Sequence, residues 1–468
     1  MSRFSLIFLC FFSFLISIFS FFNIIYSYYF DLLSGIDKYV YTLIFSLIFS
    51  FIFLFKNKVE EKVTIYENIL TVILGYFILP LLLSLPYYVG INNISLIDSY
   101  FEAISGFTST GFTIFENIKH IDETIILWRS TTQWIGGLYF LFSIILLISI
   151  FDNNLKKSLT NFLSFDTNET LKQNFKILIL YSLLTFFIFI ILRFINIRTF
   201  DAFNLSMTII SSGGFLPTNE IDTIIKTNLQ KFVLSILLLI SFYSLYLSYN
   251  LINIKKKNLN FFTEDLYLSI YLFFVIIFFF IFFNSENNFF SILFSITSSV
   301  SNIGISLKDT PSSLNFLFVL LVIIGGSFFS TSSGLRFLRL YALFKYSINE
   351  LLSHAKPKNV YINKFYLSEI EVNKSDLNKY FLSILVFIIS LFSVTFLLTI
   401  SEINVSDAFK LGILTLMNTV NSSSYQLNDF TFYDLNNYLK SVFIIYMIIG
   451  RVELLTIVIL FKKFLLKD

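Results

Sequence analysis

The sequence is poor in the side chains that most enzymes and metalloproteins use. It contains one cysteine, Cys10, which excludes an intrachain disulfide and a thiolate metal site. Its two histidines, His120 and His354, lie far apart, which argues against a histidine-rich metal site. It has no G-x-x-x-x-G-K-[ST] phosphate loop, no H-E-x-x-H zinc motif and no convincing nucleophile elbow. We therefore expect a protein that is not an enzyme and holds no resident cofactor.

Charge is scarce as well. Charged residues make up 13% of the 468-residue chain, whereas a soluble domain has roughly 25%. Hydrophobic residues make up 56%, and the mean hydropathy is +0.79. Apolar runs of ~20 residues, enough to cross ~30 Å of hydrocarbon, recur along the whole chain. These features predict an all-α polytopic membrane protein without a separate soluble domain.

Ten apolar runs are the expected membrane spans. The first is too long for a signal-peptide core and lacks a small-residue cleavage site, so we expect it to stay in the mature protein. The runs are 4–30, 39–55, 65–89, 128–151, 175–195, 232–254, 261–283, 316–344, 380–400 and 438–460.

Lysine clusters follow every second run, as at Lys255, Lys256 and Lys257. The positive-inside rule then places both termini in the cytoplasm and the four intervening loops outside. The alternative interpretation of the lysines is a docking surface for a cytosolic partner.

Four loops on the predicted outer side share one setting. Each follows an amphipathic segment of about 12–13 residues, which is too short to span a bilayer. The segments are 95–107, 199–210, 288–300 and 405–417, with capping side chains at Asp98, Asp201, Ser406 and Asp407. The loops are FTSTGFT (107–113), SSGGF (211–215), SNIGI (301–305) and TVNS (419–422).

One such loop alone is typical of an ordinary turn. Four of them, spaced by about 100 residues, predict an internal repeat around one pore. The C-terminal end of each short helix would carry partial negative charge toward the membrane centre, which favours a cation. A dehydrated K⁺ needs backbone carbonyls in place of water, and glycine reaches the required dihedrals without a Cβ clash. The expected filter positions are Gly111, Gly213, Gly304 and Asn421, with asparagine as a low-cost substitute at positive φ.

Residues 323–336 read IIGGSFFSTSSGLR and interrupt an apolar run with small polar residues. Two interpretations compete. The segment is either a helix end followed by a surface loop, or an unwound intramembrane segment beneath the filter that acts as a gate.

Arg451 lies near the middle of the last apolar run. Insertion of a central arginine costs ~2.5–3.5 kcal/mol, so this side chain should face the protein interior and have a partner. Glu453 lies on roughly the opposite helix face, and carbonyls freed at 325–334 are better candidates. A structural ion pair with another helix is the alternative. Glu102, Arg129 and Arg193 are expected near interfaces in structural roles.

These stretches together resemble the TrkH/KtrB/HKT superfamily of K⁺ transporters, and most of all its TrkH branch. The resemblance covers nearly all of the chain after about residue 60, and the first two spans match the extra helices of the TrkH branch. The matching stretches are FEAISGFTSTGFT (101–113), WRSTTQWIGG (128–137), DAFNLSMTIISSGGF (201–215), SNIG (301–304), GGSFFSTSSG (325–334) and GRVELL (450–455).

The resemblance implies ten spans plus four pore helices, a homodimer with one pore per protomer, and a TrkA-like cytosolic nucleotide-binding subunit. It implies K⁺ binding at Ser109, Thr110, Gly111, Ser211, Ser212, Gly213, Asn302, Ile303, Gly304, Thr419, Val420 and Asn421. It implies gating by Gly325, Gly326, Ser327, Ser330, Thr331, Ser332, Gly334 and Arg451.

Two departures from the family pattern stand out. Asn421 replaces a filter glycine, which bears on K⁺ over Na⁺ selectivity. Phe328 and Phe329 are bulkier than the usual small residues of the gating loop, which could tighten the barrier.

The expected fold is thus a fourfold pseudosymmetric repeat of span, pore helix, filter loop and span, preceded by two extra helices. The expected divisions are 1–60 for the N-terminal pair, 61–157, 158–258 and 259–360 for the first three repeats, and 361–468 for the fourth. The third repeat contains the gating loop.

The expected function is gated, passive K⁺ uptake across a bacterial inner membrane. A H⁺- or Na⁺-coupled symporter is the alternative, with Glu453 as its obvious titratable carboxylate. A membrane enzyme acting on lipid-linked substrates would need a cluster of catalytic carboxylates or histidines, which the sequence does not offer.

Overall fold

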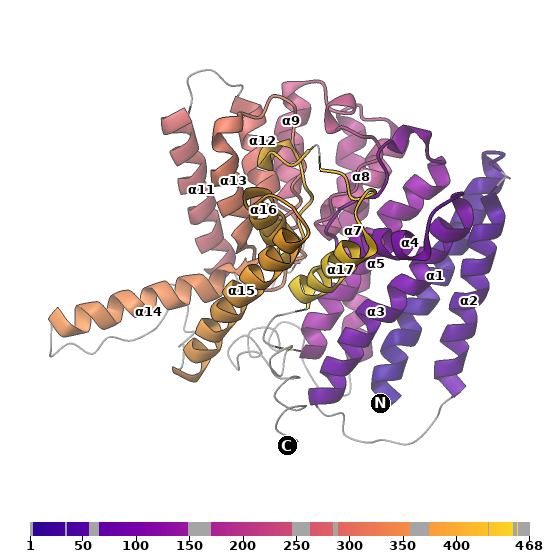
Figure 1. The fold of residues 1–468 in the computed structure, drawn as a ribbon, viewed down its shortest axis with the longest axis horizontal. Helices are drawn as coiled ribbons and strands as arrows, with labels where there is room; N and C mark the ends of the chain where they lie inside the picture. Colours follow the sequence, from indigo (N-terminus) through magenta and orange to yellow (C-terminus); the bar gives the residue numbers. More distant parts are fainter. Residues whose placement is uncertain are drawn as a thin grey trace, which may run out of the picture.

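The computed structural model describes residues 3–32, 35–55, 65–147, 170–245, 263–283, 289–355, 374–428, 430–452 and 456. The described chain is a bundle of helices, and its only sheet is a pair of two-residue strands (Figure 1). Six of the described helices are long and apolar enough to cross a membrane. The predicted all-α membrane fold is confirmed.

Two helices at the N-terminus, α1 (Arg3–Tyr29) and α2 (Ile36–Phe55), lie side by side at one edge of the bundle (Figure 1). Small polar residues are buried along both of them, among them Ser13 and Ser17 on α1 and Ser46 and Ser50 on α2. Small side chains let membrane helices approach closely. The thiol of Cys10 donates to the carbonyl oxygen of Ser50 at 3.1 Å, so Cys10 belongs to this contact.

Four short helices follow the predicted pattern, each between two flanking helices. Their ends agree with the sequence prediction to within one residue. They are α4 (Leu96–Phe107), α8 (Thr199–Ser211), α12 (Phe289–Val300) and α16 (Val405–Leu416). The flanking helices are α3 (Ile65–Gly90) and α5 (Glu123–Leu147), α7 (Thr170–Phe194) and α9 (Asn228–Leu238), α11 (Thr263–Phe283) and α13 (Asn315–Ile323), and α15 (Lys374–Ile400) and α17 (Asn437–Arg451).

The cap of α4 differs from the expected one. Ser95 is the N-cap, and its hydroxyl accepts from the backbone N–H of Asp98 at 3.1 Å. The Ser95 hydroxyl also donates to the Asp98 carboxylate at 2.7 Å. Asp98 therefore supports the first turn from inside the helix, where a negative charge is favoured by the helix dipole.

A helix end lies inside two of the predicted spans. Helix α9 ends at Leu238, because the following backbone turns to pair with residues 327–332, and residues 246–254 of this span lie outside the described part of the chain. Helix α17 ends at Arg451, followed by an extended Val452, so Arg451 is a terminal rather than a central residue of its helix. The four expected domain boundaries all lie outside the described residues, and the division into repeats stays a prediction.

Helices α4 and α17 are joined by a buried ion pair. Lys440 on α17 donates to the Asp98 carboxylate at 2.6 Å and to the Tyr433 carbonyl at 2.8 Å. The two charged side chains are 5% and 12% exposed. Because 342 residues separate Lys440 from Asp98, this contact ties the last described helix to the first of the four short helices.

We expect Lys440→Met to lower the free energy of unfolding by ~3–5 kcal/mol, because it leaves the Asp98 carboxylate buried without its partner. Thermal denaturation of the detergent-purified protein measures the loss. The matched control is Lys308→Met, which removes an ion pair to Glu220 of equal length, 2.6 Å, with both side chains about half exposed or more. That change should cost at most ~1 kcal/mol. Equal melting temperatures for the two variants would contradict the prediction.

Candidate functional site

The four loops after the short helices begin with the same backbone turn. Each helix ends in a left-handed residue: Ser109 (φ 59°), Ser212 (φ 56°), Asn302 (φ 59°) and Asn418 (φ 48°). In each loop the next residue donates its N–H to the carbonyl five residues earlier. These bonds are Thr110 to Ser105 (2.9 Å), Gly213 to Thr208 (2.9 Å), Ile303 to Ser298 (3.1 Å) and Thr419 to Leu414 (2.9 Å). The repeat is therefore visible in the backbone itself.

This shared pattern sets the register of the loops. The positions equivalent to Gly111 are Gly214, Gly304 and Val420, one residue away from the expected Gly213 and Asn421. Gly111 (φ 84°) and Gly304 (φ 79°) have the left-handed backbone that favours glycine.

The expectation that Asn421 replaces glycine at positive φ is wrong. Asn421 does not have a positive φ, and its side-chain amide donates to the Leu427 carbonyl at 3.0 Å. The left-handed asparagine of this loop is Asn418, because the turn out of α16 falls there. Valine therefore occupies the position where the other three loops carry glycine.

Each loop contacts the next, and the fourth returns to the first. A Cβ placed on Gly111 would lie 2.7 Å from the Gly214 Cα, so these two backbones touch. The other contacts are hydrogen bonds from Ser212 Oγ to the Ser301 carbonyl, from Asn302 Nδ2 to Thr419 Oγ1 (3.4 Å) and from Asn418 Nδ2 to Thr110 Oγ1 (3.0 Å). The four loops thus form a closed ring.

The first loop is held by a buried ion pair. The Glu102 carboxylate accepts from Arg129 Nε at 2.8 Å, from the Thr113 hydroxyl at 3.1 Å and from the Ile114 N–H at 3.0 Å. Neither charged side chain is more than 1% exposed. The Arg129 guanidinium also lies over the Phe215 ring at 4.1 Å, which links the first loop to the second. Both residues are buried deeper than the sequence led us to expect.

Gln133 on α5 is a residue that the sequence reasoning did not single out. A Cβ placed on Gly213 would collide with its amide, which explains a glycine at a position without positive φ. With the amide oriented to satisfy its neighbours, Gln133 Oε1 accepts from the N–H groups of Phe215 (2.8 Å) and Gly214 (3.0 Å). The sequence feature that could have identified Gln133 is its place in the WRSTTQWIGG stretch (128–137), where Gln133 packs against the second loop.

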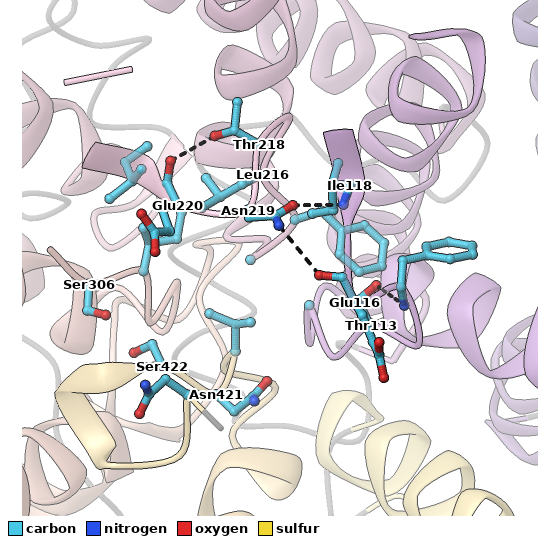
Figure 2. A pocket seen from close by; sticks show the side chains of 18 of the residues that line it. Thr113, Glu116, Ile118, Leu216, Thr218, Asn219, Glu220, Ser306, Asn421 and Ser422 are labelled. Atoms are coloured by element: carbon cyan, nitrogen blue, oxygen red, sulfur yellow. Dashed lines mark hydrogen bonds between the residues drawn. The ribbon is translucent and has the colours of Figure 1, made fainter. Parts of the chain in front are cut away.

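A cavity of about 740 Å³ opens above the ring and is lined by segments of all four loops. Gly111, Gly214 and Val420 line it directly. All four loops therefore lie on the same side of the protein, as the lysine pattern predicts. Figure 2 shows Asn219 of the second loop bonded to the first, where its side chain accepts from the Ile118 N–H at 2.7 Å.

Carboxylates predominate among the charged groups of this cavity. Glu116, Glu220 and Asp222 line it, against Lys308 and the buried Arg129. Its hydrogen bond to Glu220 raises the pKa of Lys308, so this lysine stays charged beside its partner. An acidic mouth of this kind raises the local concentration of cations.

The segment 323–336 is a buried loop and not a surface loop. Strand β1 (Ile324–Gly325) pairs in parallel with β2 (Leu335–Arg336), which closes the segment at its base. Ser327, Ser330, Thr331 and Ser332 are all buried, as are Phe328 and Phe329. We call residues 325–334 the gating loop below, after the role that the resemblance implies for them.

The gating loop touches the ring from the side opposite to the cavity. The Thr331 hydroxyl donates to the Ile210 carbonyl at the end of α8 at 2.8 Å. The Ser333 hydroxyl donates to Asn418 Oδ1 at 3.3 Å. The gating loop is therefore in direct contact with the end of the second short helix and with the fourth loop.

Arg451 lies between the gating loop and the ring. It donates to the Ser333 hydroxyl, and at 3.5 Å to the Ser109 hydroxyl and the Ser211 carbonyl. Its guanidinium lies 4.1 Å from the centre of the Phe140 ring. Its polar partners among the described residues are thus hydroxyls and a carbonyl at helix ends, and not freed loop carbonyls as expected. Glu453 lies outside the described residues.

Comparison with known proteins agrees with this geometry. Residues 307–468 match the TrkH family model, described as a cation transport protein. The chain is 25% identical over 429 residues to the Trk system potassium uptake protein TrkH of Escherichia coli, which covers 84% of this chain and 85% of that one. It is 23% identical over 426 residues to a cation transporter of Methanocaldococcus jannaschii, covering 84% and 82%.

The fold matches the crystal structure of the potassium transporter TrkH from Vibrio parahaemolyticus. The TM-score is 0.82 over 98% of each chain, at 21% sequence identity. The resemblance to the TrkH branch is confirmed. The match in fold covers 98% of the chain, whereas the TrkH family model matches from residue 307 onward.

Proposed function

We propose that this chain is a potassium uptake protein that conducts K⁺ passively and under control of a gate. The observation that carries the proposal is the closed ring of four equivalent loops beneath one acidic cavity. The relatives named above as potassium uptake proteins support the choice of ion.

The selectivity filter would be built from the backbone carbonyls of the ring, at 109–111, 212–214, 302–304 and 418–420. Carbonyl oxygens can replace the hydration shell of K⁺. Four short helices end at this ring, and the partial negative charge of each C-terminal end stabilises a cation there. Val420 would be the position at which this filter departs from glycine.

The gate would be the gating loop together with Arg451. The loop lies directly under the ring, and Arg451 places a fixed positive charge at the ends of α4 and α8. That charge occupies the place where helix dipoles would otherwise favour the transported cation. Conduction would then require the loop and Arg451 to move aside together.

The assembly would be a homodimer in a bacterial inner membrane, with one pore per protomer and both termini in the cytoplasm. A TrkA-like nucleotide-binding subunit would control the gate from the cytosolic side. The resemblance supports the assembly, and the lysine clusters support the orientation.

We expect the native chain to restore growth of a K⁺-uptake-deficient bacterial strain at low K⁺, and Gly111→Ser to weaken that rescue about tenfold or more. Serine at φ 84° is strained, and its side chain would press on Gly214. The measurement is the K⁺ concentration that gives half-maximal growth, with membrane expression checked for both chains. Rescue by Gly111→Ser equal to the native chain would contradict the filter assignment.

A coupled symporter is distinguished by its driving force. If conduction is passive, the rate of ⁸⁶Rb⁺ uptake into proteoliposomes should depend on the membrane potential and should not change when a pH or Na⁺ gradient is imposed. Uptake driven by either gradient at zero potential would favour the symporter.

A further inference from the structure

The gating loop is also held at residues other than the one that Arg451 contacts. Glu264 lies in the first turn of α11, close to Ser327 and Phe328 of the loop. One carboxylate oxygen accepts from the Phe328 N–H at 2.9 Å, and the other accepts from the Ser327 hydroxyl at 3.4 Å.

This use of a first-turn carboxylate is unusual. An acid at a helix N-terminus ordinarily serves the free N–H groups of its own helix. Glu264 instead directs both oxygens to a loop more than 60 residues away in sequence. Each hydrogen bond within a protein contributes ~0.5–1.5 kcal/mol to the position that it holds. The contact therefore adds to the stability of the observed loop position rather than to that of α11.

The same turn also fixes the backbone on which the loop rests. Asp265 accepts from the Ser244 N–H at 3.0 Å, in the segment that follows α9. That segment bonds the loop through three backbone contacts. They are Ser327 N to Phe242 O (3.0 Å), Leu245 N to Phe329 O (2.9 Å) and Ser332 N to Ser241 O (3.1 Å). The first turn of α11 thus anchors both the loop and its support.

We propose that Glu264 is a latch that holds the gating loop across the ion pathway. The inference rests on the proposed function. Arg451 engages the loop on the side of the ring, and Glu264 engages it at Ser327–Phe328. Movement of the loop out of the pathway has to break the Glu264 contacts, whereas the closed helix bundle can stay intact. Glu264 is therefore a positioning residue, and it does not contact the transported ion.

The test compares basal ⁸⁶Rb⁺ flux through the full-length chain in proteoliposomes without any partner protein. Glu264→Ala removes both acceptors, and we expect flux about tenfold above the wild type, as for the loss of one to two hydrogen bonds that hold the loop. Glu264→Gln keeps one acceptor oxygen without the charge and should fall between the two. Asp376→Asn is the matched control, because Asp376 is a buried first-turn carboxylate of α15 that pairs with Lys379. Its flux should equal that of the wild type.

A second readout follows the loop itself. Because Cys10 is the only cysteine, Cys10→Ser provides a thiol-free background in which Phe329→Cys reports on the loop. Phe329 is 3% exposed, so the introduced thiol should react slowly with a methanethiosulfonate reagent. Adding Glu264→Ala should raise that rate about tenfold, while adding Asp376→Asn should not.

The outcomes separate the latch from the underlying function. Wild-type flux that Gly111→Ser reduces and Glu264→Ala leaves unchanged would overturn the latch and leave the K⁺ pathway standing. Absence of flux in every variant would overturn both. Should Glu264→Ala fail to yield folded protein, the comparison of Glu264→Gln with the wild type decides. Higher flux through Glu264→Gln would support the latch. Equal flux and equal thiol reactivity in the two proteins would reject it.

Discussion

Arg129→Gln should abolish K⁺ uptake and destabilise the protein by ~3–5 kcal/mol. The substitution leaves the Glu102 carboxylate almost fully buried without its cation, and unpaired buried charges carry penalties of this size. Glu102 accepts hydrogen bonds from Thr113 and Ile114 at the end of the first loop. If the unpaired Glu102 side chain moves, these bonds break and the first loop is displaced. A shift of ~3 kcal/mol between loop conformations corresponds to a ~100-fold loss of the conducting form.

The measurements are growth at low K⁺ and thermal denaturation of the purified variant. Arg198→Gln is the control, because Arg198 forms an exposed ion pair with Glu123 at 3.3 Å, with side chains 68% and 43% exposed. It should change stability by no more than ~1 kcal/mol. If Arg129→Gln transports K⁺ at the native rate, the ion pair does not set the geometry of the filter.

Arg451→Ala should have the opposite effect and raise basal ⁸⁶Rb⁺ flux by about tenfold or more. The change removes a fixed positive charge from the ends of α4 and α8, and two unit charges ~4 Å apart near a protein surface repel by ~4 kcal/mol. It also releases Ser333, and with it one attachment of the gating loop.

Arg451→Lys keeps the charge and should keep flux close to that of the wild type. Arg193→Ala is a control for the loss of an arginine elsewhere, because Arg193 bonds only the nearby Ile197 carbonyl among the contacts described. Flux is measured in proteoliposomes at fixed membrane potential. A decrease in flux for Arg451→Ala would show that Arg451 supports the conducting form instead of obstructing it.

Much of the architecture follows from local features of the chain. Apolar runs define the long helices, and segments of 12–13 residues are too short to span, so the four short helices could be placed to within one residue. Hydropathy and helix length act over a few turns and are readable without the fold. The convergence of the loops on one side followed from the lysine clusters, because membrane orientation is a local electrostatic effect.

The register of the fourth loop could not be read in this way. Asn421 looked like the substitute for glycine because it was the nearest residue that tolerates a left-handed backbone. The left-handed residue is Asn418, since the end of α16 fixes where the chain turns, and Val420 then falls at the filter position. Helix ends are set by packing as much as by sequence, which is why they are predicted least well.

The sequence by itself thus determined the membrane class, the fourfold pattern and the place of the candidate filter and gate. Only the tertiary structure decided which residues hold the candidate filter and gate in place. Gln133 bonds the second loop, Lys440 pairs with Asp98, and Glu264 bonds the gating loop. Periodicity and hydropathy record what each segment does with its own neighbours and with lipid. Partners separated by tens to hundreds of residues meet only after the helices have packed, and no local pattern specifies them.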